Sequence, residues 1–130
     1  MARPNSIAIL YVVAIVLSIA IAVASVAWGG EVEEVAKLAP KYGGETEVRL
    51  YDGSRVDLLT DSVAYEADWS SKWAEGVGQA LHYAELTGKR PGLILLVKDP
   101  AKEWRSMIRA ARLCGRYSIE LRIEVVDLAK

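Results

Sequence analysis

The feature that most constrains this chain is an uncharged run at residues 7–28. A helix of that length spans roughly 33 Å at about 1.5 Å per residue, enough to cross the hydrocarbon core of a bilayer. The run therefore predicts a transmembrane helix or a signal peptide, preceded by a short tail at residues 1–6. Once these residues are set aside, about 100 remain, which is enough for one small domain.

The flanks of this run favour a membrane anchor with the domain outside the cytoplasm. Arg3 is the only charged side chain before the run, whereas residues 31–34 carry three glutamates. Positive charge tends to stay on the cytoplasmic side, which predicts a single-pass, extracytoplasmic arrangement. Signal peptides have shorter apolar stretches followed by a small-x-small cleavage site, and residues 22–24 and 25–27 both fit such a site. Secretion after cleavage is thus the alternative, and a buried soluble helix is a third interpretation.

Composition excludes several classes of protein. The chain is 52% hydrophobic and 25% charged, with a net charge of −1, so it is neither a disordered tail nor a histone-like polycation. Cys114 is the only cysteine, which excludes an intramolecular disulfide and a cysteine-rich zinc site. His82 is the only histidine, which excludes a two-histidine metal motif and disfavours a serine-histidine-aspartate triad.

Residues 31–130 alternate between helical and strand-like patterns. The pattern predicts an α/β sandwich of two or three layers on a mixed sheet, because apolar runs covered on both faces alternate with amphipathic helices. A Ser71 N-cap and Gly88 bound the second helix, and Gly115 ends the third. In chain order we expect helix 31–42, strand 47–51, a turn at Asp52-Gly53, strand 55–60, strand 62–68, helix 72–87, strand 93–97, helix 101–114 and strand 119–126.

Three carboxylates are expected at one edge of this sheet. Asp57 lies on the second predicted strand, and Glu66 and Asp68 lie two residues apart on the third, so the latter two share a face. Clustered carboxylates raise one another's pKa unless a cation neutralises them. Mg²⁺ is the natural partner, because it takes one or two protein carboxylates plus water.

The following helix presents a polar face beside these strands. Lys72, Glu75, Gln79 and Tyr83 share one side of it by their spacing of three, four and four. Such a face lines a site or is an ordinary solvated surface, and spacing alone favours the second interpretation. The buried side is predicted to consist of Trp73, Val77, Ala80 and Ala84.

In this order the residues resemble the PD-(D/E)XK nuclease superfamily, in particular its RecB-type exonuclease domains. Asp57 matches the acid of the second strand, Glu66 the acid of the third, and 79–83 (QALHY) the Q-x-x-x-Y motif. Glu31, Glu33 and Glu34 are candidates for the family's helix acid, and Glu34 is preferred. The resemblance covers roughly residues 31–97 and implies a restriction-endonuclease-like α-β-β-β-α-β core with an added α-β.

The resemblance also implies a set of roles. Asp57 and Glu66 would hold Mg²⁺ or Mn²⁺, with Asp68 as a further ligand and Glu34 in support. The family has a catalytic lysine where this chain has Asp68, and Lys72 is expected to replace that lysine from the helix. Gln79 and Tyr83 would brace the ligands or hold the substrate backbone.

A cationic stripe follows on the next predicted helix. Its members recur every three or four residues and are Lys102, Arg105, Arg109, Arg112 and Arg116. Such a stripe binds nucleic-acid phosphates or anionic lipid, or else is a solvated face whose long stems cover Trp104 and Ile108. The expected function is thus metal-dependent hydrolysis of DNA or RNA by a membrane-anchored domain. The alternative is a non-catalytic module that keeps the fold and binds nucleic acid, lipid or protein.

Overall fold

The computed structural model describes residues 30–130, so the predictions for residues 1–6 and 7–28 lie outside the described residues. Within that described part, no helix is long and apolar enough to cross a bilayer. A first helix, here called the leading helix, runs over residues 30–42. It is followed by β1 (Gly44–Arg49), β2 (Arg55–Thr60), β3 (Val63–Trp69), a 3₁₀ turn (Ser70–Lys72), α2 (Trp73–Thr87), β4 (Arg90–Val97), α3 (Pro100–Arg116) and β5 (Arg122–Asp127).

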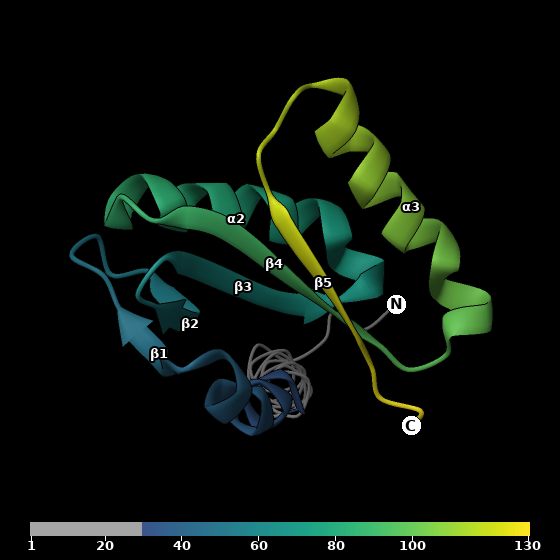
Figure 1. The fold of residues 1–130 in the computed structure, drawn as a ribbon, viewed down its shortest axis with the longest axis horizontal. Coiled ribbons are helices and arrows are strands. Elements are labelled where there is room, and N and C mark those ends of the chain that lie inside the picture. The colour runs from purple at the N-terminus through teal and green to yellow at the C-terminus, as the bar shows by residue number, and fades with distance from the viewer. Residues whose placement is uncertain (1–29) are drawn as a thin grey trace, which may run out of the picture. The chain divides into compact units, whose positions relative to one another are not determined.

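The five strands form one mixed sheet in the order β1-β2-β3-β4-β5 (Figure 1). β1, β2 and β3 are antiparallel neighbours, whereas β3 pairs with β4, and β4 with β5, in parallel. Short turns join the antiparallel strands, and the turn between β1 and β2 has Gly53 at φ +89°. The parallel part is built by crossovers through α2 and α3, as parallel strands require.

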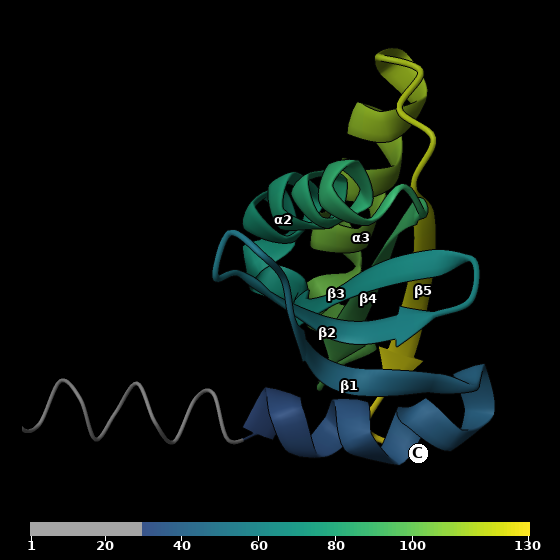
Figure 2. The same cartoon turned by 90° about the vertical axis from the view of Figure 1, so that its left-hand side faces the viewer.

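The sheet is covered on both faces, which makes a three-layer sandwich. The leading helix packs on one face through Val35, against Tyr65 and Ile94 among others. On the other face, Val77 of α2 and Cys114 of α3 belong to a second core. Figure 2 shows the leading helix below the sheet and the two later helices above it. The predicted α/β class and mixed sheet are thus confirmed.

Two helix boundaries differ from the sequence predictions. α2 begins at Trp73 without a side-chain cap, because residues 70–72 form a 3₁₀ turn in place of the predicted Ser71 cap. α3 continues through Gly115 to Arg116, and Ser118, with φ +50°, takes up the left-handed conformation just beyond it. Gly88, at φ +69°, ends α2 as predicted.

Candidate functional site

Asp57 and Glu66 form the inner half of the acidic cluster. The pairing of β2 and β3 includes Leu58 opposite Tyr65, and one further step along this register sets Asp57 opposite Glu66. The backbone N–H of Ala67 donates to Oδ2 of Asp57 at 2.7 Å, and the Asp57 and Glu66 carboxyl groups lie close enough to shift each other's pKa. The antiparallel register thus creates the cluster, because it brings two carboxyl groups face to face.

Burial dominates the electrostatics of this inner pair, although the Arg55 charge lowers the pKa of Asp57. Burial, and then the Asp57 charge, raise the pKa of Glu66 to about 10. Burial also raises the pKa of Asp57, against the lowering effect of the Ala67 amide. Oε2 of Glu66 is buried and has no hydrogen-bond partner among the described residues. Glu66 therefore carries a proton at neutral pH unless a cation replaces that proton.

Asp68, Lys72 and Glu31 form the outer half of the cluster. Asp68 lies two residues beyond Glu66 on β3, and the 3₁₀ turn brings Lys72 back beside it. The Lys72 Nζ atom lies 3.8 Å from Oδ1 of Asp68 and 3.8 Å from Oε1 of Glu31. Burial raises the pKa of Asp68 to about 7, opposed by the Lys72 charge, and it raises the pKa of Glu31 as well.

Tyr83 and Gln79 join α2 to the inner pair. The Tyr83 side chain is buried near Glu66, close enough for the Glu66 charge to raise the pKa of its hydroxyl. The hydroxyl donates to Oε1 of Gln79 at 3.3 Å, while Nε2 of Gln79 donates to Glu75 at 3.3 Å. Tyr83 is thus part of the cluster and does not face solvent, although spacing had placed it on the helix's polar face. Burial raises the pKa of its hydroxyl, and so do the charges of Glu66 and Asp57.

Most of the predicted site residues come together, but two details differ. Glu34, the preferred helix acid, accepts a hydrogen bond from Nζ of Lys37 at 2.8 Å. Glu31, one turn earlier, is the acid that lies beside Asp68. Lys72, expected on the helix, lies on the 3₁₀ turn and approaches Asp68 and Glu31.

The chemistry of the cluster suits a hard divalent cation. Its four acids present carboxylate oxygens, the ligands that Mg²⁺ prefers, and one buried acceptor on Glu66 is unpaired among the described residues. Within residues 30–130, no three histidine, cysteine, aspartate or glutamate side chains are grouped as a metal centre. The fit therefore rests on the two facing carboxyl groups, which is the number that Mg²⁺ commonly takes from a protein.

The predicted cationic stripe lies on the outer side of α3. All five of its members are exposed. Lys102 pairs with Asp99 at 3.0 Å, and the guanidinium carbon of Arg105 lies 5.2 Å from the centre of the Trp104 ring. Trp104 and Ile108 are each 46% exposed, so the long stems leave much of both side chains uncovered.

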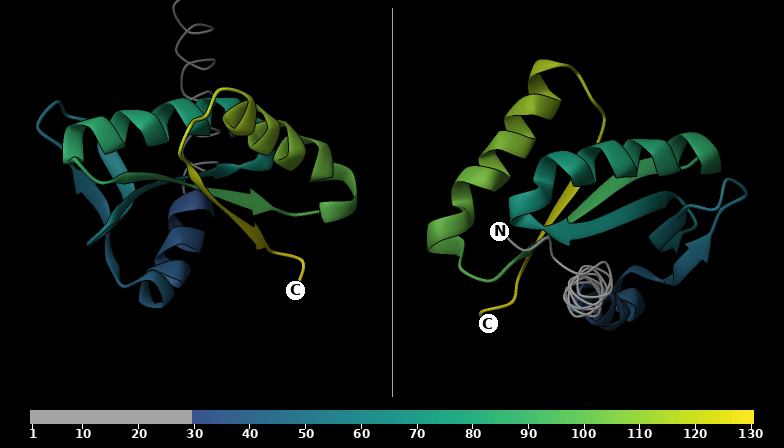
Figure 3. Two further views of the ribbon diagram at one scale, coloured as in Figure 1. Left: turned by 45° about the horizontal axis from the view of Figure 1, so that its top comes forward. Right: turned by 180° about the vertical axis from the view of Figure 1, so that it is seen from behind.

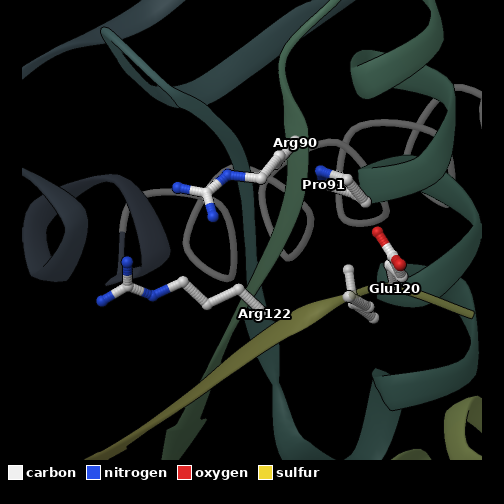
Figure 4. Close-up of a pocket in the computed structure, with 5 residues that line it drawn as sticks. Arg90, Pro91, Glu120 and Arg122 are labelled. Atoms are coloured by element: carbon white, nitrogen blue, oxygen red, sulfur yellow. The ribbon is translucent and has the colours of Figure 1, made fainter.

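A separate surface pocket of about 290 Å³ lies near the N-terminal ends of β4 and β5 (Figure 4). Five residues line it: Arg90, Pro91, Glu120, Leu121 and Arg122. The strand register sets Val63 beside Arg90 and Asp68 beside Leu95, so this pocket lies toward the opposite end of the parallel strands from the acidic cluster. No local sequence pattern indicates this pocket, because its residues come from two strand starts that only the parallel sheet brings together.

Comparison with known proteins gives one partial similarity. The chain is 28% identical over 93 residues to a putative KilA-N domain-containing protein of Acanthamoeba polyphaga mimivirus. The match covers 72% of this chain and 35% of the viral protein, so the chain spans about a third of that relative's length. No protein-family model matches the chain, and no solved structure matches it.

Proposed function

We propose that this chain is a metal-dependent nuclease that hydrolyses phosphodiester bonds in DNA or RNA. The observation that carries the proposal is that Asp57 and Glu66 face each other across β2 and β3, with Asp68 two residues beyond Glu66 and Lys72 beside Asp68. We also propose that residues 7–28 anchor the domain in a membrane, on the extracytoplasmic side.

The order of the elements supports a restriction-endonuclease-like core. A helix, three antiparallel strands, a crossover helix and a parallel strand follow one another along the chain. This is the α-β-β-β-α-β order implied by the resemblance to the PD-(D/E)XK superfamily. α3 and β5 extend that order on the parallel side of the sheet, next to β4.

Asp57 and Glu66 are the residues that would hold Mg²⁺ or Mn²⁺, with Asp68 as a further ligand. Held there, a divalent cation would polarise the phosphate and lower the pKa of bound water. Glu66 would have to lose its proton to serve as a ligand, so affinity for the cation should rise with pH.

The chain's own residues then position the reactants. Lys72 presents its ammonium group beside Asp68, where it orients the attacking water and offsets charge that develops on the phosphate. Glu31 holds that ammonium group from the other side. Tyr83 packs near the Glu66 carboxyl group, and Gln79 accepts a hydrogen bond from the Tyr83 hydroxyl and so holds it in place.

A cleavage assay with the full chain in detergent micelles tests the proposal. Single- and double-stranded DNA and RNA are each incubated with Mg²⁺, with Mn²⁺ and with chelator. Asp57→Asn keeps an acceptor for the Ala67 amide but removes the charge, and it should lower cleavage by about 100-fold or more. Asp61→Asn changes an exposed acid on the β2–β3 turn and should leave the rate unchanged. Cleavage that survives chelation or Asp57→Asn would overturn the proposal.

A non-catalytic binding module is the second candidate, and the position of Lys72 favours it. The ammonium group is ion-paired with Asp68 and Glu31, not with the inner pair. If no nucleic acid is cut with either metal, while Asp57→Asn leaves binding to the uncut strands intact, the fold serves binding alone.

A further inference from the structure

The outer side of α3 carries an exposed apolar stripe. Trp104 and Ile108 lie one helical turn apart, each 46% exposed. Ala111 and Gly115 continue the stripe toward the end of the helix and are exposed as well. Figure 1 and Figure 3 show α3 along one edge of the sandwich, with a side that faces away from α2 and the sheet.

A cationic stripe runs directly beside the apolar one. Its four arginines are exposed, and none of them forms an ion pair with another described residue: Arg105, Arg109, Arg112 and Arg116. The acids nearest to the helix start do not offset this charge. Asp99 pairs with Lys102, and Glu103 accepts hydrogen bonds from Ser70 and from the amides of Lys98 and Asp99.

We propose that this face of α3 docks on the surface of a bilayer that contains anionic phospholipids. Trp104 and Ile108 would enter the boundary between headgroups and acyl chains, while the arginines bind the lipid phosphates. Docking needs no rearrangement, because α3 packs on the core through the opposite side, by Ala110 and Cys114.

The apolar stripe is what selects lipid over nucleic acid. Both partners offer phosphates to the arginines, but a bilayer also offers an apolar phase for the Ile108 side chain. The Arg105 guanidinium lies over the Trp104 ring, so the charge sits at the very edge of the apolar stripe. This juxtaposition suits an interface at which phosphates lie directly above hydrocarbon. It does not depend on whether the acidic cluster is catalytic.

The test uses the fluorescence of Trp104 in the full chain, reconstituted into lipid vesicles. The chain has four tryptophans, so the Trp104 signal is the difference between the wild type and Trp104→Phe. Vesicles of phosphatidylcholine alone are compared with vesicles that also contain phosphatidylglycerol, each with and without brominated acyl chains. Thermal unfolding of the Trp104→Phe protein verifies that it is folded.

We expect the Trp104 emission to move to shorter wavelength, and to be quenched by brominated chains, only in the anionic vesicles. Arg105→Gln/Arg109→Gln removes two cations, and it should lower the ratio of docked to undocked protein about thirtyfold. Lys41→Gln/Arg49→Gln neutralises two exposed cations elsewhere on the surface and should leave the ratio unchanged. High salt should weaken docking, because it screens the attraction.

Three results would overturn the proposal. The first is Trp104 emission that is the same in neutral and anionic vesicles. The second is a shift caused by an oligonucleotide in detergent without lipid, abolished by Arg105→Gln/Arg109→Gln, which would make this face a nucleic-acid surface. The third is a shift in neutral vesicles that grows with the ratio of protein to lipid, which would identify a second copy of the chain as the occupant.

Discussion

The ammonium nitrogen of Lys72 lies 3.8 Å from Oδ1 of Asp68, four residues earlier in the chain. Asp68 is almost fully buried at the end of β3, whereas Lys72 is half exposed on the 3₁₀ turn that follows. In the nuclease superfamily proposed for this chain, the position of Asp68 carries a lysine. The turn thus brings a positive charge to the same end of β3 from a different point on the backbone.

Replacement of Lys72 tests whether this displaced charge serves catalysis. Lys72→Ala should lower the single-turnover cleavage rate by about 100-fold to 1,000-fold, because it removes the group that stabilises charge in the transition state. Stability should change by less than about 1 kcal/mol, since the ion pairs of this half-exposed side chain are screened by solvent. Lys37→Ala, on the leading helix, is the matched control. Equal rates for the two variants would remove Lys72 from the mechanism.

Glu31 and Glu34 give a second matched comparison. Glu31 lies beside Lys72, whereas Glu34 bonds to Lys37. Glu31→Gln should therefore lower cleavage about 10-fold and alter its pH profile, since the charge that holds the Lys72 ammonium group is lost. Glu34→Gln should leave both unchanged. The reverse pattern, measured as rate against pH, would restore Glu34 as the supporting acid.

The sequence predicted local structure well where a strong signal was present. β2 was predicted at 55–60 and runs over those residues, because a turn signal at Asp52-Gly53 precedes it. That Glu66 and Asp68 share one face of β3 followed from the two-residue period of a strand. The end of α3 was predicted wrongly, because Ser118 adopts the left-handed conformation that the pattern assigned to Gly115.

The finer arrangement of the site depends on tertiary packing. The packing of the leading helix on the sheet places Glu31, and not Glu34, beside Asp68. Likewise, the spacing of α2 put Tyr83 on a polar face, whereas in the structure its ring is buried in a cluster with Val56 and Ala64. Such relationships link residues that are far apart in the chain, so no local periodicity encodes them.

The buried Glu66 predicts a pH dependence of stability in the presence of chelator. Its pKa is raised from 4.5 to about 10 in the folded protein, so folding favours the protonated form. The contribution of Glu66 to the free energy of unfolding is therefore fully present below about pH 4.5. It is lost as the pH rises toward 10, at no more than about 1.4 kcal/mol per pH unit. Asp68, with a pKa of about 7, acts in the same direction.

Glu66→Gln copies the neutral form and should flatten this dependence. The variant should match the wild type near pH 4.5 and be the more stable of the two near pH 9, as measured by thermal unfolding at a series of pH values. Glu45→Gln, an exposed acid on β1, provides the control and should follow the wild-type curve. Parallel curves for Glu66→Gln and the wild type would show that Glu66 is ionised in the folded protein.

Two glycines of α2 make a final pair of predictions, because only one of them lies against the site. A Cβ at Gly76 would come within 2.7 Å of Cδ1 of Leu93 and 3.5 Å of Cβ of Asp68, whereas a Cβ at Gly78 would meet nothing within 4 Å. Gly76→Ala should thus destabilise the fold by about 1–3 kcal/mol through overpacking, and displacement of Asp68 should reduce cleavage as well. Gly78→Ala should stabilise it by about 0.5–1 kcal/mol, because alanine favours the helix. Thermal unfolding and the cleavage assay measure both effects, and a stabilised, fully active Gly76→Ala protein would contradict the close packing of α2 on β3.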